Sequence, residues 1–219
     1  GIDQLVVGGD MIDRGPDSGK VVQYLRSLQY TYPESVHVLM GNHEDMLLSF
    51  FQGKSDQWVH HGGYEASLSF EREKIAQGAL EWVTTRPILF EDDEYVYVHA
   101  GLVPGIPLDN QPVDENLWMP YSERGIRFAD YPLEAIRKTT GGKKVVFGHT
   151  PKNYVFDDGI RICCDLGAGF TESNRKLALV DLTNDTVYQT LTNGNPEVRV
   201  RKIARKRVEK NDGVQNVQR

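Results

Sequence analysis

A chain of 219 residues, 39% of them hydrophobic, is long enough to bury the core of one large α/β domain, so a single domain is expected. The formal net charge of −6 argues against a globally basic surface, and no nucleic-acid partner is expected. The sequence has no apolar run of bilayer length and no signal-like segment, so no membrane partner is expected and a cytoplasmic location is predicted.

The first half of the chain alternates strand and helix signals. A short aliphatic run stops at two glycines, and Pro16, Asp17 and Ser18 then supply residues typical of a helix start. The same order follows in the next segment, where Gly41 interrupts the pattern. The elements expected in this half are a strand at 5–7, a helix from about 18, a strand at 36–40, a helix at 44–51 and a mostly helical segment at 55–84.

Short strand signals dominate the second half. The expected strands lie at 88–90, 95–98, 145–147, 154–156, 160–163, 177–180 and 187–191. Turn signals rich in Asp, Asn and Gly separate several of these strands. The whole pattern predicts an α/β fold in which two sheets pack together with helices outside them.

Three features of the second half bear on its organisation. The proline-rich stretch from Pro104 to Pro132 is expected to be a long surface loop. Cys163 and Cys164 are the only cysteines, and we expect two reduced core residues, with a redox pair as the alternative. The sequence from residue 194 is polar and contains RVRKIARKR, which predicts a domain at 1–193 followed by a polar, partly basic tail at 194–219.

Polar side chains of the metal-ligating kind follow four of the expected strands. Asp10 follows the first of these strands, Asn42 and His43 follow the second, and His99 and His149 follow two later ones. Ligands bind beyond the carboxyl ends of strands in α/β sheets, so these side chains can converge. One Asp, one Asn and two His form a mixed oxygen and nitrogen donor set, which suits Mn, Fe, Zn or Ni better than Ca.

Four short motifs carry these residues. They read GDMIDRG (Gly9–Gly15), GNHE (Gly41–Glu44), HAGL (His99–Leu102) and GHT (Gly148–Thr150). In this order the chain resembles the calcineurin-like metallophosphoesterases over about residues 5–180, in particular their bacterial phosphoprotein phosphatase branch. The resemblance implies a four-layer α/β/β/α sandwich with two mixed sheets flanked by helices. It also implies two divalent metal ions, with manganese expected before iron, zinc or nickel, and hydrolysis of a phosphomonoester or phosphoanhydride.

The resemblance also assigns roles to single residues. Asp10 would bridge the two metal ions, and Asn42, His99 and His149 would complete the protein ligands of the second ion. His43 would protonate the leaving oxygen.

Three further residues take phosphate-directed or orienting roles in the same resemblance. Asp13 would orient the imidazole of His43 and favour its charged form. Arg14 would bind the phosphate bidentately. A second phosphate-binding arginine is expected in the loop after HAGL, where Arg124 is the first candidate and Arg127 the alternative.

One motif of the resemblance is not found in this sequence. Members of the family carry an Asp-x-His motif before the GD motif, and it supplies two ligands of the first metal ion. We therefore expect an N-terminally shortened enzyme that lacks the first strand, with a natural form that keeps only the second metal site as the alternative. This version is expected to bind one divalent ion much more tightly than a second and to show little turnover.

Three functions remain open at this point. The first expectation is a protein serine/threonine phosphatase acting on a phosphorylated protein. The alternative on the same scaffold is a hydrolase of a nucleotide substrate, a dinucleoside polyphosphate such as diadenosine tetraphosphate. A catalytically silent phosphate-binding module is the third. An aromatic residue near the site would favour a nucleotide, and Trp118 is expected to anchor its loop rather than to stack on substrate.

Overall fold

The computed structural model describes residues 3–121, 124–169, 176–191 and 198–205. Its strands are β1 (Leu5–Val7), β2 (Val36–Val38), β3 (Leu89–Glu91), β4 (Tyr95–Val98), β5 (Lys144–Phe147), β6 (Phe156–Asp157), β7 (Arg161–Cys163), β8 (Lys176–Asp181), β9 (Thr186–Leu191), β10 (Val198–Lys202) and β11 (Ala204–Arg205). Its α-helices are α1 (Ser18–Thr31), α2 (Asn42–Phe51), α3 (Tyr64–Arg72), α4 (Gln77–Thr84), α5 (Val113–Trp118) and α6 (Leu133–Thr139). A wide helical turn, Val59–Gly63, leads into α3.

The described strands form three sheets. The largest has the order β11-β6-β7-β5-β4-β3 and is mixed: β4, β5 and β7 run parallel to one another, β3 runs antiparallel to β4, and β6 runs antiparallel to β7 but parallel to β11. A second sheet, β10-β9-β8, is antiparallel, and β1 pairs with β2 in parallel. The parallel pairs β4-β5 and β1-β2 each bring two carboxyl ends to one sheet edge, and those ends carry the residues of interest.

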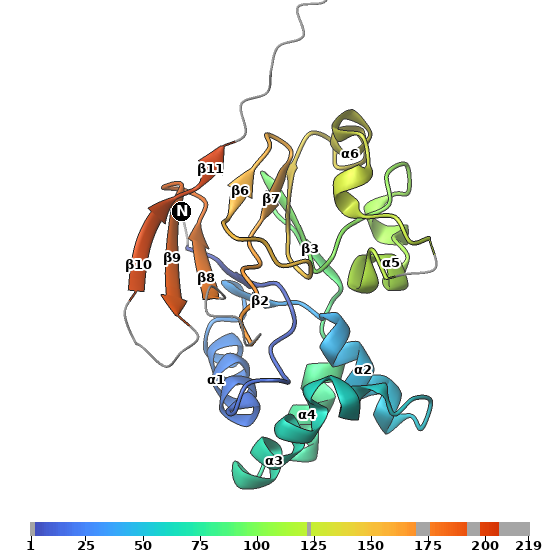
Figure 1. Ribbon diagram of the computed structural model, residues 1–219, viewed down its shortest axis with the longest axis vertical. Helices are drawn as coiled ribbons and strands as arrows, with labels where there is room; N and C mark the ends of the chain where they lie inside the picture. Colours follow the sequence, from blue (N-terminus) through green and yellow to red (C-terminus); the bar gives the residue numbers. More distant parts are fainter. Residues whose placement is uncertain (1–2, 122–123, 170–175, 192–197, 206–219) are drawn as a thin grey trace, which may run out of the picture.

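Helices cover the strands from two sides. Helices α1 to α4 gather around β1 and β2 at one end of the molecule, whereas α5 and α6 lie beside the six-stranded sheet (Figure 1). The first group is held by an apolar cluster that includes Leu25, Val38, Leu47 and Phe70. Burial of such side chains is the main favourable term that fixes these helices on the strands.

Two further apolar clusters complete the layers. One joins strands β4 and β5 to Met119, Phe128 and Ile136 on the side of α5 and α6. The other joins Ile162 of the large sheet to Val187 of the antiparallel sheet, so side chains of both sheets share a core. Helices therefore lie outside two packed layers of strands, and the predicted α/β fold with mixed sheets and flanking helices is confirmed.

The stretch from Pro104 to Pro132 is not the long surface loop that its prolines predicted. It contains α5 and short 3-10 turns at Leu108–Asn110 and Phe128–Asp130. Pro107, Pro112 and Pro132 immediately precede a 3-10 turn, α5 and α6, positions where a fixed φ and a missing N–H favour a helix start.

The expected tail also differs in its first part. Strand β10 pairs with β9, and β11 pairs with β6, so residues 198–205 belong to the sheets. The physical reason lies in the sequence: Val198 and Val200 alternate with arginines at the strand period of two, and Ile203 is buried in the core shared by the two sheets. The rest of the predicted tail, 206–219, lies outside the described residues.

The two cysteines are free and packed, as expected. Cys163 is buried in β7, and Cys164 is partly buried. Burial raises the pKa of the Cys163 thiol to about 12 and raises that of Cys164 as well. Both side chains therefore stay protonated and poorly nucleophilic at neutral pH.

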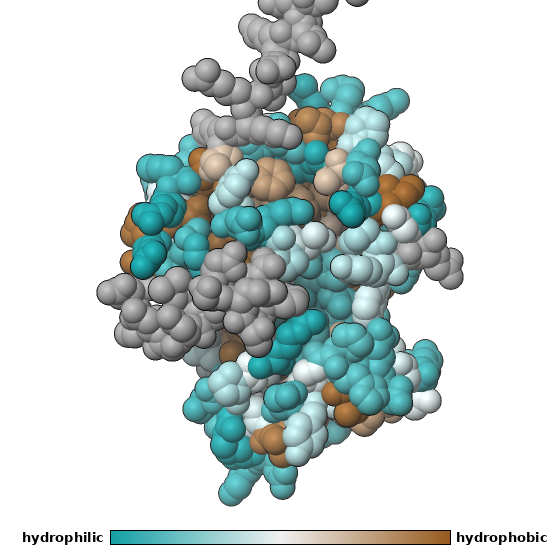
Figure 2. Space-filling model, viewed as in Figure 1, coloured by the Kyte–Doolittle hydropathy of each residue, from teal (hydrophilic) through white to brown (hydrophobic). Residues whose placement is uncertain are grey.

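The visible surface is mostly hydrophilic, and its hydrophobic side chains form small, separate patches (Figure 2). Within the part of the chain that the structure describes, each helix is too short or too polar to cross a bilayer.

Candidate metal centre

Four side chains converge at the carboxyl ends of the parallel strands. Asp10 follows β1, Asn42 is the first residue of α2, His99 directly follows β4, and His149 lies two residues after β5. Donor atoms of Asp10, His99 and His149 all lie within 4.8 Å of one another. Asn42 Oδ1 is 3.1 Å from His99 Nε2 and 3.0 Å from His149 Nδ1. Residues 107 positions apart in the chain are thus brought into one cluster.

The ring nitrogens of both histidines are arranged to offer lone pairs. His99 Nδ1 donates to the Gly8 carbonyl oxygen at 2.8 Å, so its unprotonated Nε2 faces the cluster. Burial and the neighbouring His99 lower the pKa of His149 to about 3, which keeps that imidazole neutral. Neutral imidazoles are the form that binds metal ions.

The spacing of the donor atoms fits a single cation. His99 Nε2 and His149 Nδ1 are 3.1 Å apart, and Asp10 Oδ1 is 3.4 Å from His99 Nε2. Ligand atoms about 2.1 Å from a metal ion lie about 3.0–3.4 Å from one another at octahedral or tetrahedral angles. The oxygen and nitrogen donors suit manganese, iron, zinc or nickel. The cluster is therefore a possible metal site, and the role of each residue as a ligand remains a proposal.

Unusual backbone conformations gather at this cluster. Among the described residues, positive φ at a residue other than glycine occurs at six positions, and four of them are Asp10 (54°), Asp13 (74°), Arg14 (55°) and His149 (65°). Such conformations are costly for L-residues and persist where the surrounding contacts determine them. The loops that carry the site residues are therefore held in place by their contacts.

Glu44 makes three hydrogen bonds to these loops, a role that the sequence did not indicate. Its side chain is fully buried and accepts the backbone N–H groups of Asp10 at 2.8 Å, Met11 at 2.9 Å and Gly41 at 2.7 Å. Burial and the adjacent Asp10 raise the pKa of Glu44 to about 7. One side chain at the start of α2 thus ties the loop after β1 to the loop after β2.

Replacing Glu44 with Ala should destabilise the protein and loosen the cluster. The substitution leaves three buried N–H groups without an acceptor, and one such group already costs about 1–3 kcal/mol. We expect the free energy of unfolding, measured with urea in the absence of metal, to fall by about 3 kcal/mol or more. The exposed Glu65 provides the matched control, Glu65→Ala. Equal stability of the two variants would contradict the account.

A buried acid–base pair lies beside the cluster. His43 Nδ1 is 2.6 Å from Asp13 Oδ2, and the backbone N–H of His43 donates to Asp10 Oδ1 at 3.1 Å. Burial opposes the charged imidazole, but the hydrogen bond to Asp13 and the charge of Asp10 outweigh it and raise the pKa of His43. Burial raises the pKa of Asp13, although its bond to His43 partly offsets this. The predicted pairing of these two side chains is present.

The two arginines differ in their surroundings. Arg14 is exposed, and its positive charge disfavours protonation of both His43 and His149, although larger effects raise the pKa of His43; the guanidinium therefore lies near the cluster. Arg124 forms an ion pair with Glu115 of α5 at 3.2 Å, and its side chain is half exposed. Contact of Arg124 with phosphate, and the alternative Arg127, remain predictions.

Two aromatic residues at the end of α5 and in the turn after it lie near the cluster. One is placed to anchor its loop, and the other faces the cluster. The Trp118 indole N–H donates to Asp45 Oδ2 of α2 at 2.8 Å, in keeping with an anchor for its loop. Tyr121 lies edge-on to His149, with ring centroids 5.8 Å apart, and is 77% exposed. Sequence reasoning missed Tyr121, because only the turn after α5 brings it to the cluster.

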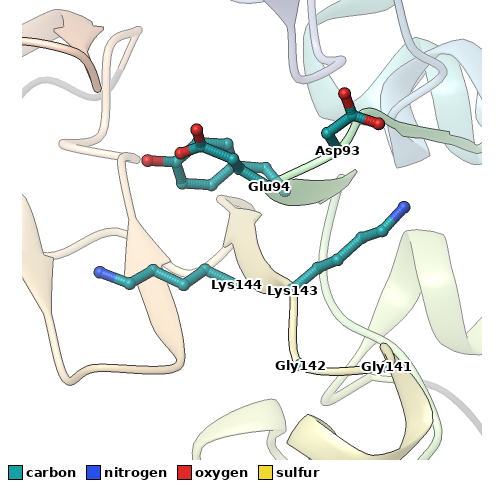
Figure 3. A pocket seen from close by; sticks show the side chains of 7 residues that line it. Asp93, Glu94, Gly141, Gly142, Lys143 and Lys144 are labelled. Carbon is teal, nitrogen blue, oxygen red and sulfur yellow. The ribbon is translucent and has the colours of Figure 1, made fainter.

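A separate hollow of about 420 Å³ lies at the opposite ends of the same strands. It is lined by Lys143 and Lys144, which point in opposite directions beyond the Gly141–Gly142 turn (Figure 3). Lys143 pairs with Glu91 at 2.8 Å, and Lys144 pairs with Asp157 at 2.6 Å. Both cations are already neutralised by carboxylates, so this hollow does not offer the charge that a phosphate requires.

The chain matches one protein family over most of its length. The family model for the calcineurin-like phosphoesterases matches residues 1–164, and the chain belongs to this family. The expected resemblance to the calcineurin-like family is thereby confirmed.

Two of the curated relatives that the chain matches share one description. The chain is 33% identical over 102 residues to a symmetrical bis(5'-nucleosyl)-tetraphosphatase of Vibrio parahaemolyticus, a match that covers 47% of this chain and 35% of the relative. A tetraphosphatase of the same description from Klebsiella pneumoniae is 34% identical over 104 residues, covering 47% and 34%. The matches thus span only about a third of the length of these relatives.

Solved structures share the fold. A protein serine/threonine phosphatase from Saccharomyces cerevisiae superposes with a TM-score of 0.59 at 17% identity, covering 92% of this chain and 70% of that chain. A cold-active protein tyrosine phosphatase superposes with a TM-score of 0.57 at 18% identity, covering 89% and 67%. At these identities the likeness concerns the fold alone.

Proposed function

We propose that this chain hydrolyses phosphate esters or anhydrides at the cluster of Asp10, Asn42, His99 and His149. The observation that carries the proposal is the position of this donor set directly beside the buried His43–Asp13 pair. The backbone N–H of His43 donates to Asp10 Oδ1, so the residue that carries the proposed proton donor contacts the carboxylate that is proposed to hold the metal. A metal site next to a protonatable imidazole is the combination that phosphoester hydrolysis needs.

Each side chain has a distinct task in this proposal. His43, held by Asp13, donates a proton to the leaving oxygen as the bond to phosphorus breaks. Arg14 binds non-bridging phosphate oxygens through its guanidinium. Asp10, Asn42, His99 and His149 hold a divalent cation, which when bound supplies positive charge to the phosphate and lowers the pKa of water. The other cation of the proposed pair would also be held by Asp10, and manganese is the first metal to test.

For the substrate we propose a dinucleoside polyphosphate. The names of the curated relatives support this choice, which was the alternative rather than the first expectation from the sequence. Tyr121 adds independent support, since an exposed aromatic ring beside His149 can stack on a base of the substrate. A phosphoserine or phosphothreonine protein is the second candidate, because the same exposure of Tyr121 leaves the rim open to a larger substrate.

A panel of substrates assayed with Mn²⁺ distinguishes these candidate functions. The protein is assayed with diadenosine tetraphosphate, a phosphoserine peptide and para-nitrophenyl phosphate, and products are identified by chromatography. We expect the highest kcat/KM for the tetraphosphate, with cleavage of one anhydride bond. Preference for the phosphopeptide would favour the protein phosphatase. Little turnover is expected while the first metal site lacks Asp-x-His, so the panel is repeated with a version to which a segment carrying that motif is added. Binding of Mn²⁺ without turnover of any substrate by either version would contradict the hydrolase and favour a phosphate-binding module.

A further inference from the structure

Asp13 makes one strong contact with each of its carboxylate oxygens. Oδ2 lies 2.6 Å from His43 Nδ1, and Oδ1 accepts the indole N–H of Trp58 at 2.9 Å. The side chain of Asp13 has 0% of its surface exposed, and that of His43 has 3%. A buried carboxylate whose two oxygens are both bound cannot rotate without breaking a hydrogen bond. Trp58 therefore fixes the plane of the carboxylate that faces His43.

The indole is itself held rigidly. Trp58 is 4% exposed and belongs to the apolar cluster of α1 to α4, with the Phe50 ring 5.1 Å away. Gly63 lies against its ring so closely that a Cβ there would be 2.5 Å from Trp58 Cδ2. Close packing against Phe50 and Gly63 resists rotation of the ring.

The turn that follows Trp58 also supports the neighbouring backbone. Gly62 has a φ of +106°, and a Cβ on it would lie 2.5 Å from the backbone nitrogen of Arg14. Asp13 and Arg14 both have positive φ. The segment 58–63 thus packs directly on the strained loop that carries both side chains.

We propose that Trp58 is a positioning residue, which acts on the reaction through Asp13 by holding its carboxylate toward His43. The expected effect of Trp58 on the reaction rate rests on the proposed function. Its effect on the orientation of Asp13 rests on the contacts of Trp58 alone. The sequence did not indicate this role, because it depends on a contact between residues 45 positions apart.

The variant Trp58→Phe removes the N–H donor and retains an aromatic ring. We expect kcat for an alkyl phosphate to fall by about 10- to 100-fold, the range found for groups that orient a catalytic or ligating histidine. The loss should be smaller for para-nitrophenyl phosphate, whose leaving group needs less protonation. KM and Mn²⁺ affinity should stay close to those of the wild type. Equal losses for both substrates would overturn the proposal.

Trp82→Phe is the matched control. Trp82 also donates its indole N–H to a side chain, Gln29, at 2.9 Å, and it packs against the same apolar cluster. Its variant should lose stability without any dependence on the leaving group. The double variant Trp58→Phe/Asp13→Asn should be no slower than Asp13→Asn alone, because the indole acts through that carboxylate. Additive losses would contradict a role through Asp13.

A second measurement does not require turnover. Nuclear magnetic resonance can follow the proton shared by His43 and Asp13, whose signal is assigned by its loss in His43→Asn. We expect this proton to exchange with water faster in Trp58→Phe than in the wild type or in Trp82→Phe. Unchanged exchange would overturn the positioning role. Absence of turnover in the wild type would bear on the proposed function alone. The exchange rate of the His43–Asp13 proton would still test the positioning role of Trp58.

Discussion

His43→Asn should lower turnover of a substrate with a poor leaving group by about 10²- to 10⁴-fold, the usual contribution of general acid catalysis. The imidazole is held 2.6 Å from Asp13 and its pKa is raised by that bond and by Asp10 despite its burial, so it is available as a proton donor. Asparagine has no such proton to give. The measurement is kcat for a series of alkyl and aryl phosphates of increasing leaving-group acidity.

The test compares the loss of kcat caused by His43→Asn between substrates with different leaving groups. Aryl phosphates with acidic leaving groups should lose least, and Mn²⁺ affinity should be retained, because His43 is not among the four proposed ligands. His60→Asn is the control, since the His60 side chain is 71% exposed. If all substrates lose activity equally, or if the metal is lost, His43 is a ligand or a structural residue.

His99→Ala should abolish tight binding of a divalent cation. His99 is buried, and its hydrogen bond to the Gly8 carbonyl aims Nε2 at Asn42 and His149. Loss of a partner that merely orients a ligand costs about 10- to 100-fold in affinity, so loss of the ligand itself should cost more than about 100-fold. Isothermal titration with Mn²⁺ measures this affinity, and turnover measured at the same concentrations should fall with it.

His60→Ala is again the matched control and should bind Mn²⁺ as the wild type does. Full retention of affinity in His99→Ala would place the cation elsewhere. Retention of turnover after loss of the cation would contradict a metal-dependent mechanism.

The sequence predicted most elements because their signals are local. The periodic strands and helices of the first half, and β4 at 95–98, appear where the pattern placed them. The segment from Pro104 to Pro132 was mistaken for a loop because proline density is a composition signal, whereas its meaning depends on whether each proline begins a helix. Strand β10 was mistaken for part of a tail because its valines alternate with charged residues in a basic segment. All its side chains are exposed, so no buried face marks the strand.

The site was predictable as far as it depends on strand ends. Asp10, Asn42, His99 and His149 each follow a strand, and parallel strands bring such residues together. Glu44, Trp58 and Tyr121 could not be found this way, because their roles depend on contacts with loops distant in sequence. For Glu44 the one available signal was its place in GNHE, three residues after the glycine that it caps.

Other expectations remain predictions. Arg124 lies half exposed beside Glu115, and its movement toward a phosphate depends on a substrate. The expectation of an incomplete first metal site, and of a preference for one cation, also stays a prediction. Titration of Mn²⁺ while turnover is followed tests the cation preference.

The central claim is that one divalent cation binds between two imidazoles, a carboxylate and an amide oxygen. Pulsed electron paramagnetic resonance on the Mn²⁺-loaded protein tests it most directly, because nitrogen nuclei bound to the ion modulate the signal. The account predicts modulation from two histidine nitrogens, and loss of one contribution in His149→Ala. A bound Mn²⁺ with oxygen ligands only, or a signal unchanged in His149→Ala, would contradict the proposed centre.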